Sequence, residues 1–452
     1  MPSPVWTPLE RPRRVRLWVF AGAALGILAL GVGYVAHLVR SLDTPEFKAW
    51  MLARASDAVG ARVQARTVKV TILRGVTFEG VTIANPPPFK GDLATAEALA
   101  LRYDPWSLLR GRLELAKLSV EKPVLDLAMD SKGVFNYERL GGSRAAPAAT
   151  SATAFPIELA VSKLSLNSAR IVMRDPRGAL VKVDGALLDT SVRLARASVE
   201  GEGKLKVAVL NLADTFFVRG VSAPLHASNG SLKLAPLRAT LAGGAIDGDV
   251  DVRLQKGFRF VAKLSVKGAE LRTLLQEAKA TSGMSGTLVG DAVVEGSGGV
   301  GTLEGKGQVE VKDCTVTQVP LLTLLSTVLA VPELARPDFD ECRGTFTLGD
   351  GRLVNPSLSF KGKAVQLTGR GATSLRTLAL DYDMTLALSQ ALARRIPAEE
   401  LRAAFKDRHD GFVTIDFKVT GTTSAPRSDL AMRVGRAAAE SGLKKLLRRK
   451  FF

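Results

Sequence analysis

The sequence predicts a mainly β protein that an N-terminal transmembrane helix attaches to a membrane. Residues 17–39 contain no fully charged side chain, and short runs of alternating apolar and polar residues extend from Val68 to Val419. Glycine, proline and Asp/Asn/Ser clusters separate these runs, as turns separate strands. We therefore expect one membrane-spanning segment, then a long antiparallel sheet with a few short helices.

The apolar segment at residues 17–39 has the length of a transmembrane helix. At about 1.5 Å of rise per residue it crosses a hydrocarbon core about 30 Å thick. A cleaved signal peptide fits less well, because Ala36-His37-Leu38 lacks the small-residue cleavage pattern. More arginines precede the segment than follow it, so the positive-inside rule places the N-terminus in the cytoplasm and the rest in the periplasm. The arginines are Arg11, Arg13, Arg14 and Arg16 before it and Arg40 after it.

Composition restricts the kind of partner and the kind of site. The net charge of +18 suggests an anionic partner, and outside the cytoplasm phospholipid or anionic envelope polymers fit better than nucleic acid. A GC-rich genome is an equally good reason for many arginines. The only cysteines, Cys314 and Cys342, exclude a disulfide framework and a multi-cysteine zinc site, while one disulfide between them stays open.

The alternating runs are expected to be strands with one buried face. Before them, apolar residues at helical spacing predict a helix from Phe47 to Gly60, and after Ile83 the run Asn85-Pro86-Pro87-Pro88 must break a strand. Further strands are expected at residues 68–72, 76–83, 113–120, 192–195, 205–210, 232–234, 250–254, 258–266, 309–311, 346–348, 358–360, 365–368, 378–388 and 413–419, and helices at 105–111, 269–280, 321–331 and 397–406.

Several short motifs follow one another in the first 140 residues. They are the apolar segment at 17–39, the helix end Ala58-Val59-Gly60-Ala61-Arg62-Val63, the turn Ile83-Ala84-Asn85-Pro86-Pro87, the piece Leu108-Leu109-Arg110-Gly111, and Gly133-Val134-Phe135-Asn136-Tyr137-Glu138-Arg139-Leu140. In this order they resemble the AsmA family of Gram-negative envelope proteins, which usually has Trp where Tyr137 stands. The resemblance implies a taco-like or groove-like β fold with an apolar inner surface, and a role in building or maintaining the outer envelope.

A sheet this long cannot stay flat, because open sheets beyond about ten strands curl, split or close. Strand spacing alone favours a pair of compact β-sandwiches, whereas the resemblance favours one curled sheet that forms a trough. In a trough, inward residues such as Leu380 and Ile415 are candidate phospholipid contacts.

The chain divides into a basic N-terminus, an anchor, two β modules, a linker and a tail. The linker is rich in small residues. After it, Leu164, Ile171 and Asp175 repeat the order of Leu118, Val124 and Asp130, so we expect the second module to use the same hairpin again. The boundaries are 1–16, anchor 17–39, first module 41–140, linker 141–153, second module 154–432 and tail 433–452.

No motif assigns a catalytic, cofactor or metal site. Gly296 to Gly301 matches G-x-G-x-x-G but leads into another strand, so we interpret it as a hairpin loop. Asp247, Asp249 and Asp251 lack the glycine and glutamate of a calcium loop and read as a solvated acidic stripe. The three histidines, His37, His226 and His409, have no metal-like partner at suitable spacing. We therefore expect no enzyme activity.

The tail is predicted to be a basic amphipathic helix. Its apolar residues fall on one helical face and basic residues surround them, which suits contact with an anionic membrane. A solvated tail helix and a docking element for a partner protein remain alternatives. The candidate membrane contacts are Leu443, Lys444, Lys445, Leu446, Leu447, Arg448, Arg449 and Phe451.

Together these features predict an inner-membrane-anchored periplasmic protein that binds or conducts phospholipid along an apolar β groove. The expected partners are phospholipid, the membrane and an envelope protein. The alternative is a non-catalytic scaffold that assists outer-membrane proteins through its sheet edges.

Overall fold

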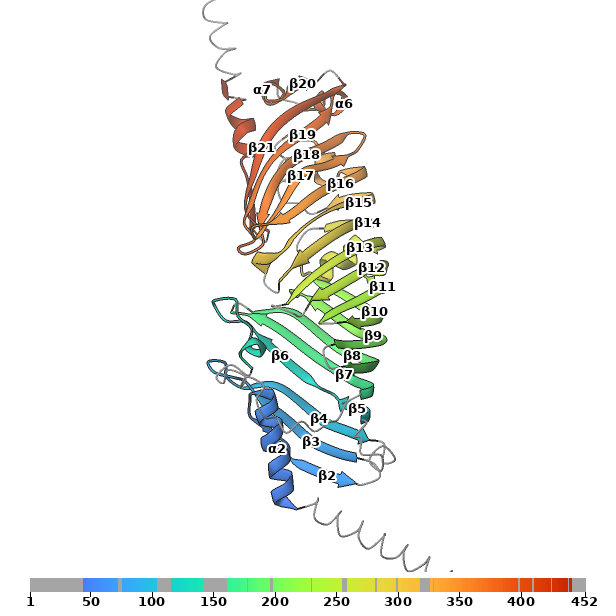
Figure 1. The fold of residues 1–452 in the computed structure, drawn as a ribbon. Coiled ribbons are helices and arrows are strands. Elements are labelled where there is room, and N and C mark those ends of the chain that lie inside the picture. The colour runs from blue at the N-terminus through green and yellow to red at the C-terminus, as the bar shows by residue number, and fades with distance from the viewer. Residues whose placement is uncertain are drawn as a thin grey trace, which may run out of the picture.

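The computed structural model shows a long curled β-sheet with a few short helices (Figure 1). The residues it describes are 44–71, 75–103, 115–140, 161–176, 178–195, 198–228, 230–253, 258–280, 283–297, 300–317, 326–327, 329–396, 399–408, 410–423, 425–437 and 439–440. The predicted anchor, the helix at 105–111, the linker 141–153 and residues 443–451 of the tail lie outside them. In this part of the chain, no helix is both long and apolar enough to span a bilayer.

Helix α2 (Pro45–Val59) opens the described chain, close to where the sequence predicts a helix. Its N-cap is Thr44, whose hydroxyl accepts a hydrogen bond from the backbone N–H of Phe47 at 3.3 Å. Gly60 ends it with a φ of 73°, a left-handed conformation that favours glycine. The short helices α4 (Leu271–Glu277) and α7 (Glu399–Arg402) lie inside the helices predicted at 269–280 and 397–406. Helix α6 (Gln390–Ala393) lies shortly before α7 in the chain.

The described strands all belong to one sheet. They are β1 (Val63–Gln64), β2 (Thr67–Thr71), β3 (Gly75–Ala84), β4 (Asp92–Tyr103), β5 (Leu115–Glu121), β6 (Val124–Ala128), β7 (Val161–Asp175), β8 (Gly178–Ala195), β9 (Ser198–Leu212), β10 (Phe216–Ser228), β11 (Ser231–Leu241), β12 (Gly244–Arg253), β13 (Arg259–Glu270), β14 (Gly283–Gly296), β15 (Glu304–Thr317), β16 (Asp338–Gly349), β17 (Arg352–Lys361), β18 (Val365–Ser374), β19 (Leu380–Ser389), β20 (Lys406–Arg408), β21 (Phe412–Thr422) and β22 (Ala425–Ser428).

Most strands pair antiparallel with their sequence neighbours. This holds from β2 to β5 and again from β7 to β19, after which β19 pairs with β21. The predicted meander is therefore confirmed, and two packed sandwiches are wrong for the described strands. At the far end, β20 and β22 pair with the two ends of β21.

The exception is a parallel junction between β5 and β6 on one side and β7 on the other. Leu118 lies opposite Leu164, and Leu125 lies opposite Ile171. The repeated order in the sequence thus marks two strands side by side. They are not a hairpin used again, because the first copy forms β5 and β6 and both of these strands pair in parallel with β7, the single strand of the second copy.

The sheet has an apolar face and a polar face along its whole length. Cross-strand partners carry the apolar face from strand to strand, for example through Leu234, Val250, Ala262 and Val294. Glycines take some positions on this face and lie under large neighbours, as Gly307 does under the ring of Phe346. A side chain at such a glycine would collide with its neighbour, so the small residue permits the close packing that curling requires.

The two long rims of the sheet differ. On one, the covered rim, the strand ends connect through residues 85–91, 129–140, α4, the 3-10 helix η3 (Pro332–Ala335) and α6–α7. On the other, the open rim, short connections join β10 to β11, β16 to β17 and β18 to β19. Among the described residues, the segments that cover the apolar face therefore come from the covered rim.

Candidate functional site

The candidate site is the half of the apolar face that borders the open rim. Here the inward side chains are only partly buried, including Val250, Phe260, Val294, Leu348 and Leu353. A hollow of about 750 Å³ lies against the strands of this region. Leu264, Ala292, Gly307 and Phe346 of the apolar face line it, together with residues of the polar face such as Asp247 and Lys263. Such a surface can accept apolar ligands without opening the core.

The half that borders the covered rim is a closed core. Leu237, Ile246, Val311 and Leu386 are buried there in one hydrophobic cluster. Three covering segments add Leu274, Leu334 and Ile396 to this cluster. In the described part of the chain, the open half is therefore the less buried half of the apolar face.

The two predicted groove residues lie on the same face but in different halves. Leu380 begins β19 at the open rim and is partly buried. Ile415 lies on β21 opposite Leu386, is 8% exposed, and belongs to the closed core together with Phe405 and Leu430. The structure thus places Leu380 in the open half of the apolar face, which is the candidate site. It places Ile415 in the closed core.

Ion pairs attach two covering segments. Arg219 of β10 pairs with Glu277 of α4 at 2.7 Å, and the Glu277 side chain is 19% exposed. Arg395, just after α6, pairs with Glu333 of η3. The first pair joins a covering segment to the sheet, and the second joins two covering segments to each other. Both therefore help to hold these segments at the covered rim.

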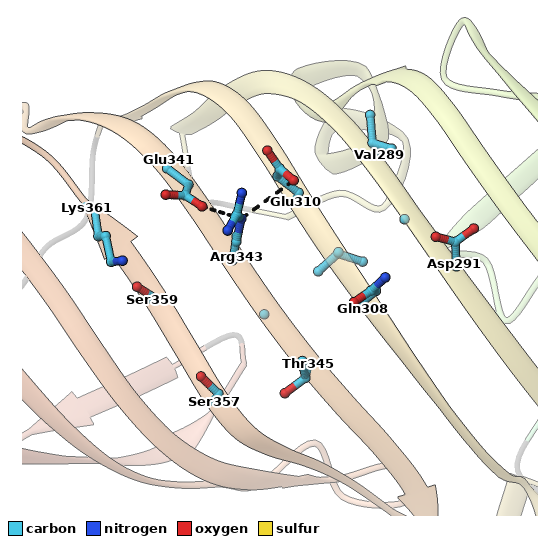
Figure 2. A pocket seen from close by; sticks show the side chains of 13 residues that line it. Val289, Asp291, Gln308, Glu310, Glu341, Arg343, Thr345, Ser357, Ser359 and Lys361 are labelled. Carbon is cyan, nitrogen blue, oxygen red and sulfur yellow. Dashed lines mark ion pairs between the residues drawn. The ribbon is translucent and has the colours of Figure 1, made fainter.

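The polar face carries charged side chains that pair with one another. Figure 2 shows a hollow of about 540 Å³ on this face, where Arg343 lies between Glu310 and Glu341 and where Ser357, Ser359 and Lys361 project from β17. The nitrogen Nε of Arg343 is 3.6 Å from a carboxylate oxygen of Glu310. In this hollow, the charge of Arg343 is paired with those of Glu310 and Glu341. We therefore interpret the hollow as part of the solvent-exposed polar face.

The acidic stripe and the glycine-rich motif have the structures that the sequence predicts. Asp247, Asp249 and Asp251 are exposed on β12, and each faces a basic residue of a neighbouring strand: Arg238, Lys263 and Lys233, respectively. Gly296 ends β14, and the 3-10 helix η2 (Val300–Thr302) leads into β15, so the motif is a hairpin connection.

Cys314 and Cys342 lie on the neighbouring strands β15 and β16 as free, buried thiols. A hydrogen bond joins the two sulfur atoms. This hydrogen bond lowers the pKa of Cys314, because it stabilises the Cys314 thiolate. It raises the pKa of Cys342, because Cys342 must keep its proton to make the bond. The disulfide that the sequence left open is not formed in this structure.

A polar cluster at the covered rim joins two of the sequence motifs. The buried side-chain nitrogen Nδ2 of Asn136 donates to the Asn85 side-chain oxygen at 2.8 Å and to the Asp126 carbonyl at 2.7 Å. Next to it, Phe135 is 2% exposed and stacks on Tyr137, with ring centroids 5.3 Å apart. The turn at Asn85 and the motif around Asn136 therefore form one structural unit.

Asp130 organises the turn that precedes this unit. Its carboxylate accepts hydrogen bonds from the backbone N–H groups of Val134 at 3.0 Å and Lys132 at 2.9 Å, and from Arg139 at 2.6 Å. The Val134 hydrogen bond is the largest cause that lowers the pKa of Asp130. Because the charged carboxylate makes these contacts, the turn depends on ionised Asp130.

We expect Asp130→Asn to lower the unfolding temperature at pH 7 and to matter less in acid. A carboxyl with a lowered folded pKa stabilises the fold above its unfolded pKa of about 4, and this contribution disappears as the pH falls through the folded pKa. Thermal melts of both proteins from pH 7 to pH 3 measure the difference. Asp251→Asn, on the exposed stripe, is the control, and a difference for Asp130→Asn that stays constant with pH would contradict the assignment.

Residues 73–220 match the sequence model of the AsmA family. This match supports the resemblance to the AsmA family for that segment of the chain. The AsmA segment contains the Asn85–Asn136 unit, the parallel junction and most of the strands that precede the hollow. No curated protein and no solved structure matched the chain in our comparisons.

Proposed function

We propose that this AsmA-family protein is anchored in the inner membrane by residues 17–39, extends into the periplasm and holds phospholipid during outer-envelope biogenesis. The observation that supports this most directly is the open half of the apolar face. Its partly buried side chains continue across many strands, and short turns leave its rim accessible. Acyl chains placed there would gain about 0.8 kcal/mol for each buried CH₂ group.

The open rim suits polar head groups. Arg253, Arg259, Arg352 and Arg376 are exposed at strand ends or turns along it, and acidic residues such as Asp350 lie between them. A phospholipid whose chains lie on the apolar face would place its phosphate near this rim, in water and within reach of guanidinium groups. Movement of a phospholipid along this line of arginines needs no covalent step. We therefore assign no enzyme activity.

A photoreactive amino acid tests this function. We expect benzoylphenylalanine at Phe346, on the apolar face of β16, to cross-link phospholipid in cells. The matched control is the same substitution at Arg343, which lies on the same strand, is exposed on the polar face and does not line the hollow of about 750 Å³. Mass spectrometry of the purified adducts identifies the lipid. Equal lipid labelling at both positions, or protein adducts alone at Phe346, would refute the groove.

At the C-terminal edge of the sheet, the scaffold alternative has less support. Donating a sheet edge requires unpaired backbone groups along a strand. At the C-terminal end, β20 covers residues 412–414 of β21 and β22 covers residues 419–422, while the backbone N–H of Lys418 between them donates to Asp429. This edge is therefore largely occupied. Contact of the tail residues 443–451 with a membrane or an envelope protein stays a proposal from the sequence.

A further inference from the structure

Helix α2 carries two stacked aromatic side chains, of which Trp50 is exposed and Phe47 is partly buried. Phe47 and Trp50 stack with ring centroids 5.7 Å apart and an interplanar angle of 21°, and Trp50 is 56% exposed. None of the α2 residues whose exposure the structure describes is buried. The exposed ring of Trp50, stacked on the partly buried ring of Phe47, forms an apolar patch on the surface of the described chain.

The opposite side of α2 holds the helix to the sheet. The Ser56 hydroxyl donates to the Leu52 carbonyl at 2.7 Å and accepts from the backbone N–H of Val63 in β1 at 2.9 Å. At about 100° per residue, Phe47 lies roughly half a turn around the helix from Ser56. Trp50 and Arg54 fall on the Phe47 side, so this side points away from the attachment to β1.

The position of α2 in the chain indicates what covers this patch. The predicted anchor ends at Val39, and the helix cap is Thr44. Five residue steps span at most about 18 Å of extended chain, so the first turn of α2 must lie close to the bilayer surface. Tryptophan and phenylalanine favour the membrane interface, and arginine favours anionic head groups.

We infer that α2 lies on the outer surface of the membrane that holds the anchor, with Phe47 and Trp50 among the lipid head groups and upper acyl chains and Arg54 beside the phosphates. This inference rests on the anchor proposed above. The occupant is the bilayer surface itself, reached by a helix that is tied to the sheet through Ser56. The contact fixes the direction in which the sheet leaves the membrane.

Brominated lipids test the contact in the full-length protein. The chain has tryptophans at positions 6, 18, 50 and 106. A variant with Trp6→Phe, Trp18→Phe and Trp106→Phe retains only Trp50 and leaves α2 unchanged. We expect its fluorescence, in vesicles of phosphatidylethanolamine and phosphatidylglycerol, to be quenched at least threefold more by lipids brominated near the head group than that of the control.

The control adds Trp50→Phe and Leu187→Trp to the same background. Leu187 is 43% exposed on the polar face of β8, away from the open rim, so its probe has comparable exposure to water. Alkaline extraction of the vesicles separates two failures. If the protein stays in the membrane and Trp50 is quenched no more than the control, α2 makes no membrane contact. If alkali releases the protein and Trp50 is unquenched, the anchor and this inference both fail.

Discussion

Ile415→Asp is expected to unfold the C-terminal end of the sheet, whereas Leu380→Asp is expected to leave the protein folded and reduce its bound phospholipid. Ile415 is 8% exposed in the closed core, where an unpaired carboxylate costs about 3–5 kcal/mol. Leu380 is partly buried at the open rim, where a new charge keeps contact with water. Circular dichroism melts and lipid extraction from the purified variants measure the two effects.

Conservative variants control for the change in volume. Ile415→Val should cost only about 0.5–1.5 kcal/mol, and Leu380→Ala should reduce bound lipid less than Leu380→Asp. A folded Ile415→Asp protein that lost its lipid would show that the cover over β21 opens. A folded Leu380→Asp protein with its full lipid content would place the acyl chains elsewhere.

Asn136→Ala is expected to destabilise the first part of the sheet by about 2–4 kcal/mol. The change removes three hydrogen bonds of a fully buried side chain: the two that Nδ2 donates and the one that Oδ1 accepts from the backbone N–H of Tyr137. Each partner that stays buried without a hydrogen bond costs about 1–3 kcal/mol. Urea unfolding measures the loss. Asn85→Ala removes one of the same contacts, so a double-mutant cycle should give a coupling of about 1 kcal/mol between the two residues.

The neighbouring aromatic position provides a control for this result. Tyr137→Trp keeps a ring against Phe135 and should change the stability much less than Asn136→Ala. If the effects of Asn85→Ala and Asn136→Ala simply add, the two motifs are independent and the hydrogen bond between them carries no stability.

The sequence is sufficient to predict the type of sheet but not its extent. Alternation with a period of two identifies strands because successive side chains point to opposite faces. The expected runs are nevertheless too short: residues 192–195 form only the end of β8, which covers Gly178–Ala195, and β10 and β14 were not predicted. Glycine, serine and alanine weaken the pattern in these strands, and the cross-strand pairing that stabilises them is not a local property.

The candidate site shows the same division. The alternation with a period of two predicts that Leu380 and Ile415 point to the inner face of their strands. Both do lie on the apolar face. Their different burial depends on the closed core around Ile415, to which the segments just before β20 and just after β22 add Phe405 and Leu430. Likewise Asn85 and Asn136 each stand in a motif that the sequence reveals, but only the fold brings their side chains together. The signal in the sequence was a polar residue, Asn136, between two aromatic residues. If the aromatic neighbours are buried, such an asparagine must find hydrogen-bond partners inside the protein.

The consecutive pairing of strands also affects how this protein loses its structure. Almost every strand contacts only the strands beside it, so the sheet resembles a row of repeats more than a globular domain. In such a row, stability is a sum of local strand and interface energies, and opening can begin at either end without disturbing the middle. Unfolding should then proceed in stages, and a destabilising substitution should loosen its own strands and their neighbours while distant strands keep their hydrogen bonds.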